Sequence, residues 1–132
     1  MNSLFYPLQR MALHIPGTGP AHDPSRAHLY IVINNPCANN LNLVVPVSSA
    51  HPNCDRTCLL TSGHEFIKHE SHALYSRADT VQKEKLCASV EAGIIQYRGL
   101  FGEVEFAAVV AGILISPHTR PRVKRYFREN CL

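Results

Sequence analysis

Histidine is the residue of this 132-residue chain that offers the most chemistry, because the chain contains eight of them. His28 lies two residues after Arg26, and residues 64–72 contain three more. An imidazole titrates near neutral pH, so it can both accept and donate a proton during catalysis. We take His28 and His69 as the leading acid–base candidates, although the number of histidines does not single them out.

Four metal-binding residue types also stand close together, in the spacing H-x2-C-x3-C-x5-H: His51, Cys54, Cys58 and His64. Zinc accepts all of them in a tetrahedral site. The gap between the two ligand pairs is short, however, and Cys58 belongs to an apolar run that suits a buried thiol. The set is an alternative site, and we expect no bound metal and no cofactor.

Positive charge is unevenly distributed in a chain whose net charge is only +3. Five cations and no acid occupy residues 118–128: Arg120, Arg122, Lys124, Arg125 and Arg128. Such a run is either a solvated helix end or a surface that binds phosphate. We predict phosphate contacts at Arg122, Lys124 and Arg125, and further contacts at Lys68 and Arg77.

The composition indicates one folded domain spanning residues 1–132, with 45% hydrophobic and 17% charged residues. Nothing near the N-terminus resembles a signal peptide, and the longest apolar stretch, Phe106 to Ile115, is too short to span a bilayer. An odd number of cysteines, five, favours reduced thiols. We therefore expect a cytoplasmic protein without membrane contact.

Short β-rich runs alternate with turns over the first two thirds of the chain. Pro36 to Asn40 joins two of them as a hairpin, and Pro46 suggests an edge strand or the end of a strand. The predicted strands are Arg10–Ile15, His28–Asn34, Leu41–Val47, Arg56–Thr61, Ser71–Ser76 and Thr80–Lys83.

Apolar residues recur at helical spacing over residues 100–115, and Pro117 ends this pattern. The helix is apolar nearly all round, so we expect it to be well buried. Thr119 is the expected cap of a second short helix, with Pro121 in its first turn. The predicted fold is α+β, mainly β: a partly closed antiparallel barrel, a C-terminal amphipathic helix and a short basic helical tail.

The order of these segments resembles the MazF/PemK toxins. The resemblance rests on RAHLYIVI (26–33), VVPVSS (44–49), SHALY (71–75) followed by ADTV (78–81), and the helix ending at Ser116. It covers residues 9–116, and residues 117–132 form a basic extension. The chain departs from the family pattern at Ala27, where a Pro is usual, and at Ser48, where a Thr is usual. Residues 63–71 have no counterpart in that pattern.

The resemblance implies an SH3-like barrel, usually a homodimer, that cleaves single-stranded RNA at specific sequences without a metal. It also implies growth inhibition and neutralisation by a cognate antitoxin. In such cleavage the RNA 2′-OH attacks the phosphate, so a base, an acid and a cation are needed. By resemblance Arg26 stabilises the transition state, and Ser48, or Ser49 if the register slips by one, hydrogen-bonds a phosphate oxygen.

Two other functions fit the same pattern. One is a non-catalytic toxin of the same barrel architecture that binds and poisons a partner such as DNA gyrase. The other is a small nucleic-acid-binding accessory domain that uses Arg122, Lys124 and Arg125. A nuclease needs Arg26 and Ser48, whereas neither alternative does, so these two residues discriminate among the hypotheses.

Overall fold

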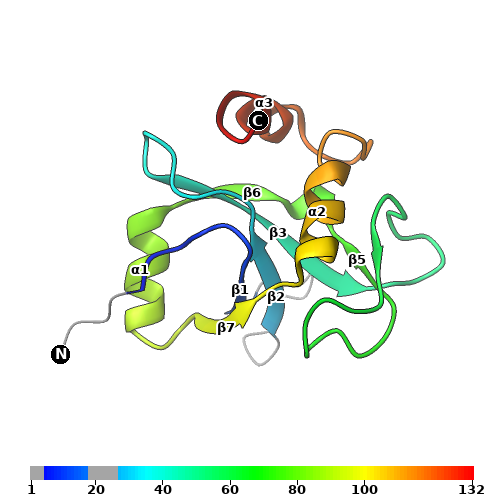
Figure 1. Ribbon diagram of the computed structural model, residues 1–132, viewed down its shortest axis with the longest axis horizontal. Coiled ribbons are helices and arrows are strands. Elements are labelled where there is room, and N and C mark those ends of the chain that lie inside the picture. Colours follow the sequence, from blue (N-terminus) through cyan, green and yellow to red (C-terminus); the bar gives the residue numbers. More distant parts are fainter. Residues whose placement is uncertain (1–4, 18–26) are drawn as a thin grey trace.

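The computed structural model describes residues 5–17 and 27–132 (Figure 1). In this part the chain forms one seven-stranded sheet, three α-helices and a short 3-10 helix. The strands are β1 (Met11–Pro16), β2 (Ala27–Val32), β3 (Leu41–Ser49), β4 (Leu59–Leu60), β5 (Ser71–Ala73), β6 (Asp79–Gln82) and β7 (Gln96–Leu100). The helices are η1 (Tyr75–Arg77), α1 (Lys83–Glu91), α2 (Glu103–Gly112) and α3 (Pro121–Asn130).

All strand pairs are antiparallel, as expected. The order across the sheet is β4-β5-β3-β2-β1-β7, and β6 pairs with the other half of β3. Among the described residues β4 and β7 do not pair, so the sheet is not closed. The α+β prediction is confirmed, and the curved sheet is consistent with a barrel that stays open.

Strand β3 is central and continues to Ser49, which corrects the prediction that Pro46 marks an edge or a strand end. β2 pairs along one side of it, and β5 and then β6 pair along the other. The carbonyl of Pro46 accepts a hydrogen bond of 2.8 Å from Leu74 N, just before η1. The N and C=O of one strand residue point the same way, so the missing N–H of Pro46 faces the interruption between β5 and β6. A proline is tolerated there because the ladder needs no donor.

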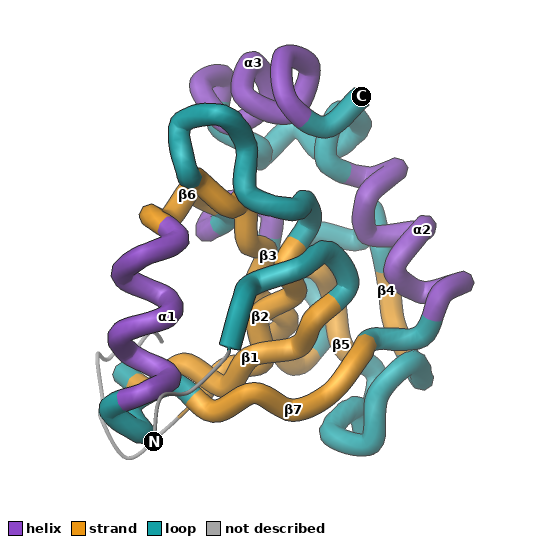
Figure 2. The backbone as a smooth tube through the Cα atoms, turned by 60° about the vertical axis from the view of Figure 1, so that its left-hand side comes forward, coloured by secondary structure: helices purple, strands orange, loops and turns teal. Residues whose placement is uncertain are grey.

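The central strands bury both of their faces, which explains their continuous apolar sequences. Leu43 and Val45 pack with Val109 and Phe127 on one face, whereas Val44 packs with Leu86 on the other. Figure 2 shows α1 on one side of the sheet and α2 on the other. None of the helices in the described segments is long and apolar enough to cross a membrane.

Helix α2 is only partly buried, so the prediction of a well buried helix was wrong. Val109 and Gly112 face the core, but Val104 is 79% exposed and Ile115, just beyond the helix, is 70% exposed. Gly112 lies in close contact with the buried Tyr75, whose hydroxyl donates a 2.7 Å hydrogen bond to the Val109 carbonyl. The outer face of α2 is therefore an apolar surface without cover from the described chain.

Helix α3 docks on the sheet through Val123 and Phe127. Pro121 occupies its first turn, but its N-cap is Arg120 rather than Thr119, which is buried and whose Oγ1 has no hydrogen-bond partner among the described residues. The Tyr126 hydroxyl donates to the Leu41 carbonyl and accepts from Asn34 Nδ2, both at 3.1 Å. These contacts fix the basic tail against the β2–β3 hairpin.

Candidate functional site

Ser48 lies at the end of β3, directly opposite His72 on β5. Leu29 faces Val47 in the β2–β3 register, and the same register carried one residue further brings His28 opposite Ser48. Ser48 and His28 are both half-buried. Three side chains suited to hydrogen bonding and proton transfer therefore form a row across three neighbouring strands.

His72 is almost fully buried, at 2% exposure, and its Nδ1 has no hydrogen-bond partner among the described residues. The ring of His51 stands edge-on to it, with the two centroids 5.8 Å apart. Burial, and then the nearby His51, lower the pKa of His72 below its ordinary 6.5, although Asp55 and the backbone of Ser48 and Ser49 act in the opposite direction. His72 is thus a neutral imidazole at physiological pH. The sequence signals for its position were the predicted strand Ser71–Ser76 and the SHALY segment of the resemblance.

The loop that carries His51 is tied down by Asp55. One carboxylate oxygen accepts from Thr57 N (3.0 Å) and Thr57 Oγ1 (2.6 Å), and the other accepts from Ser116 Oγ (2.6 Å). Burial tends to raise the pKa of Asp55, but the hydrogen bonds from Ser116 and Thr57 lower it further than burial raises it. The carboxylate therefore stays ionised and holds the His51 loop against the end of α2.

Ser49 and His69 are also brought together, with Ser49 Oγ and His69 Nε2 sharing a hydrogen bond of 2.7 Å. Side chains alternate along a strand, so Ser49 shares its face with Val47, and Ser48 shares its face with Pro46 and Val44. The two serines therefore serve opposite faces of the sheet. The roles of Ser49 and His69 stay predictions, on the face away from His28 and Ser48.

A groove of about 480 Å³ opens on the Ser48 face of the sheet, between α1 and the start of α3. Tyr30, which pairs with Pro46, and Ile15, which pairs with His28, form part of its lining, so the groove approaches the Ser48 row. Its cations are Arg77, which was predicted, and Lys85 and Arg120, which were not. The other lining residues are Gly17, Val44, Asp79, Thr80, Val81, Leu86, Ser89 and Ile95.

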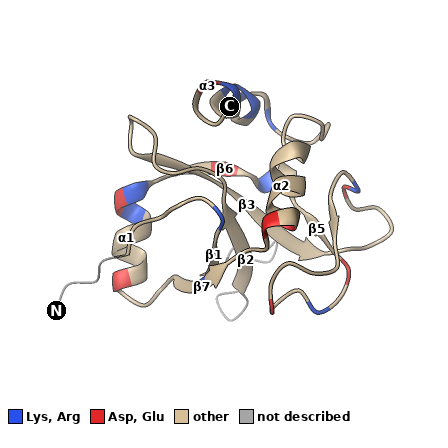
Figure 3. Cartoon of the chain, viewed as in Figure 1, with Lys and Arg blue, Asp and Glu red and all other residues tan. Residues whose placement is uncertain are grey.

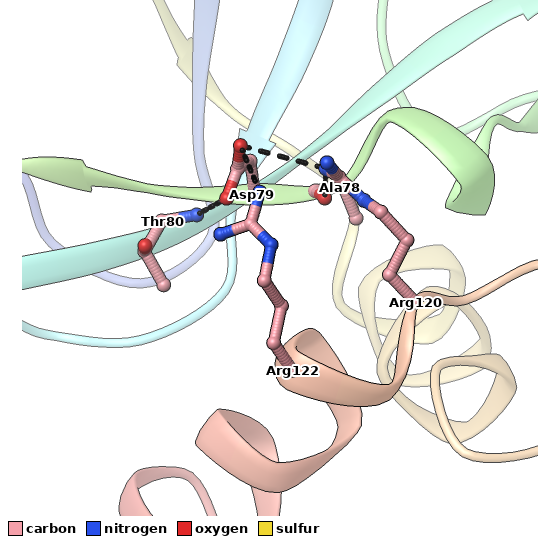
Figure 4. Close-up of polar contacts among 5 residues, drawn as sticks. All are labelled: Ala78, Asp79, Thr80, Arg120 and Arg122. Atoms are coloured by element: carbon pink, nitrogen blue, oxygen red, sulfur yellow. Dashed lines mark hydrogen bonds and ion pairs between the residues drawn. The ribbon is translucent and has the colours of Figure 1, made fainter.

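Asp79 lies in the groove wall between two arginines at the start of α3 (Figure 4). Its Oδ2 is 3.0 Å from Arg122 Nη2 and 3.4 Å from Arg120 Nη2. Its Oδ1 accepts a 2.8 Å bond from Thr80 N, and Arg120 Nη2 also donates to the Ala78 carbonyl at 2.5 Å. Burial opposes ionisation of Asp79, but the hydrogen bonds from Arg122 and Thr80 and the two arginine charges lower its pKa overall.

The remaining predicted phosphate contacts do not line the groove. Arg125 is exposed and Lys124 is half-buried on α3, where Figure 3 shows a concentration of basic residues. Lys68 is exposed in the β4–β5 loop. Arg122 does not line the groove itself but pairs with Asp79, which does. Arg26, the predicted catalytic cation, lies outside the described residues.

The four residues of the zinc alternative are not brought together. Cys58 is buried beside Tyr75, and burial raises the pKa of its thiol. His64 stacks on Phe66 at 5.3 Å and bonds to the Arg98 carbonyl at 2.6 Å, whereas His51 packs on His72. Over residues 5–17 and 27–132 no group of three His, Cys, Asp or Glu side chains can hold a metal ion.

The fold and this site define a small antiparallel-sheet protein with a Ser–His row beside a cationic groove. No family model matches the sequence, and no curated protein matches it. The fold is similar to a chain in the crystal structure of MazE-MazF (Form-II) from Deinococcus radiodurans, with a TM-score of 0.53 and 11% sequence identity. The match covers 83% of this chain and 92% of that chain. At this identity the likeness establishes a distant MazF-like fold.

Proposed function

We propose that this protein is a toxin that cleaves single-stranded RNA at specific sequences without a metal. The observation that carries the proposal is the row of His28, Ser48 and His72 beside a cationic groove, on a MazF-like fold. Cleavage by the RNA's own 2′-OH needs a base, a phosphate ligand and positive charge, and no cofactor. The row and the groove supply these groups on one face of the sheet.

In the proposed reaction His28 accepts the proton of the 2′-OH, whose oxygen attacks the adjacent phosphorus. The bond from phosphorus to the 5′-oxygen then breaks, which leaves a 2′,3′-cyclic phosphate and a 5′-hydroxyl. The leaving oxygen takes a proton from a second acid, for which Arg26 is the candidate, because His69 bonds Ser49 on the opposite face of the sheet. Ser48 donates a hydrogen bond to a non-bridging oxygen, and Arg26 balances the added negative charge.

His72 is too buried to meet the substrate, and in this proposal it positions Ser48. A buried neutral imidazole beside the end of β3 excludes water from this part of the sheet without adding a charge. Hydrogen-bond donors and charges act most strongly in such a water-poor setting. Its effect on cleavage would then pass through the placement of Ser48.

The protein partners we propose are a cognate antitoxin and a second copy of the chain, both in the cytoplasm. Large apolar side chains exposed near α2 support a protein partner: Leu100 (50%), Val104 (79%) and Ile115 (70%). The similar fold occurs in a complex described as MazE-MazF. An antitoxin tail that covers the groove would block access to Ser48.

Incubation of the purified protein with a long unstructured RNA in the presence of EDTA tests the activity. The proposal expects fragments with discrete ends at a short common sequence, each with a 2′,3′-cyclic phosphate. Intact RNA, or cleavage that requires added metal, would refute the proposed mechanism.

A further inference from the structure

We propose that the groove between α1, β6 and the start of α3 binds one nucleotide of the RNA, next to the bond that is cut. Its phosphate would lie against Arg77, Lys85 and Arg120, and its base would lie over Tyr30. The inference rests on the proposed function for the choice of ligand. The groove itself is defined by its own charges and shape.

The charges of the groove suit a phosphate. Arg77 and Lys85 are exposed, and neither forms an ion pair with a carboxylate of the described chain. Arg120 forms the third corner, anchored by the Ala78 carbonyl, and its Nε is buried without a hydrogen-bond partner among the described residues. Three cationic side chains, one each from η1, α1 and the N-cap of α3, thus line one concave surface.

Asp79 contributes one negative charge to the wall of the groove. Its carboxylate is held between Arg120 and Arg122, at 3.4 and 3.0 Å. Together with Arg77 and Lys85, these arginines give four cations against one acid, so the groove keeps an excess of positive charge. A bound phosphate would compete with Asp79 for Arg120, and removal of the carboxylate should therefore strengthen binding.

The floor of the groove suits a base rather than a bare phosphate. Tyr30, Val44 and Ile95 provide an aromatic ring and aliphatic side chains, and Ser89 and Thr80 add hydroxyls to the lining. Aromatic side chains beside cations are the usual surface for a base of single-stranded nucleic acid. An inorganic anion would leave this apolar floor unused.

The position of Tyr30 connects the groove to the cleavage site. Tyr30 faces Pro46, and Ser48 is the next residue of β3 on the same face. Alternate residues of a strand are about 7 Å apart. A chain with its scissile phosphate at Ser48 can therefore place the neighbouring nucleotide over Tyr30.

Fluorescence anisotropy tests this with a short fluorescein-labelled single-stranded RNA in which fluorine replaces every 2′-OH. Such RNA lacks the nucleophile, so binding is measured without cleavage. The double variant Arg77→Gln/Lys85→Gln should weaken binding at least about tenfold. It should also lower the slope of log K against log salt by about 1.4, or about 0.7 for each lost contact.

Lys83→Gln is the control for loss of charge from α1. It removes one positive charge from the helix that carries Lys85, but Lys83 lies over the Tyr6 ring at 5.4 Å and does not line the groove. Its affinity should stay within about twofold of wild type, and Asp79→Asn should bind several-fold tighter. Melting curves of all variants confirm that they are folded.

The proposal is overturned if wild type fails to bind, if the double variant binds like wild type, or if Lys83→Gln weakens binding equally. The two proposals can fail separately. Groove-dependent binding without cleavage of natural RNA would refute the nuclease and keep the groove. Cleavage of natural RNA, with binding that is unchanged in the Arg77→Gln/Lys85→Gln variant, would keep the nuclease and refute the groove.

Discussion

Ser48 and His72 lie opposite each other on the neighbouring antiparallel strands β3 and β5, with His72 buried and Ser48 half-exposed. Ser48 also shares its face of β3 with Val44, which lines the groove. Ser48 therefore pairs with a buried imidazole on one neighbouring strand, and its own face of β3 continues toward the cationic groove. This arrangement suits a hydroxyl that must hold a fixed direction toward a ligand.

Ser48→Ala should reduce RNA cleavage by roughly 10²- to 10³-fold, the usual cost of one donor to a developing negative charge. Ser49→Ala is the matched control, because it deletes the same hydroxyl one residue later, on the opposite face. It should retain activity within about threefold of wild type. The measurement is the initial cleavage rate of one labelled RNA by each variant. Equal losses of rate in both variants would contradict the claim that only the Ser48 face of the sheet is catalytic.

His72 should make the protein less stable in mild acid. Its pKa is lowered in the folded state. As the pH falls below about 6.5, His72 therefore takes up a proton more readily in the unfolded chain than in the native protein, which favours unfolding. The stability it contributes is present above its unfolded pKa and is lost as the pH falls below that value. His14, whose pKa is lowered by burial and then by Arg98 and His64, acts in the same direction.

Urea unfolding at pH 7.5 and pH 5.0 measures this effect. Wild type should lose free energy of unfolding at the lower pH, and His72→Gln should lose less, because Gln has no proton to bind. His69→Gln is the control at an exposed histidine and should follow wild type. An identical pH dependence in wild type and His72→Gln would contradict the assignment of a neutral buried imidazole.

Cleavage should depend on the RNA 2′-OH and not on a metal ion. EDTA should leave the rate unchanged, because the proposed groups are all side chains. An RNA with a single 2′-deoxy nucleotide at the scissile position should remain whole while other sites are cut, because that position has lost its nucleophile. If the deoxy position were cut, water would be the attacking group and His28 would need another role.

Tyr126→Phe should lower the free energy of unfolding by about 1–3 kcal/mol. The change removes the bond to Leu41 and leaves the buried Asn34 amide without this partner. Tyr97→Phe removes the same hydroxyl from a tyrosine that is 42% exposed and should change stability by less than about 0.5 kcal/mol. Equal effects would show that α3 is not held by Tyr126.

The central strands could be predicted from sequence because both of their faces are buried. Leu41–Val47 and His28–Asn34 are nearly continuous β-branched and apolar runs, and the hairpin between them is local. Helix α1 and strand β7 were missed. Helix α1 buries only Leu86, and β7 is an exposed strand whose pairing with β1 is set by distant residues.

The site was only partly predictable for a related reason. The Ser48 prediction came from a family resemblance. Its partner on β5, His72, is one of eight histidines, and the composition does not distinguish among them. Lys85 and Arg120 carried no motif, because the groove forms only when α1 and α3 pack beside β6. The exposure of α2 could not be read from its sequence either, because an apolar helix can face a core or a partner.

The most direct test of the nuclease proposal is induced expression of wild type beside Arg26→Ala, with primer extension on the extracted RNA. The account predicts growth arrest with discrete new RNA ends in wild type, and loss of both in the variant at unchanged melting temperature. Arrest without new RNA ends, or equal cleavage by a folded Arg26→Ala, would contradict it.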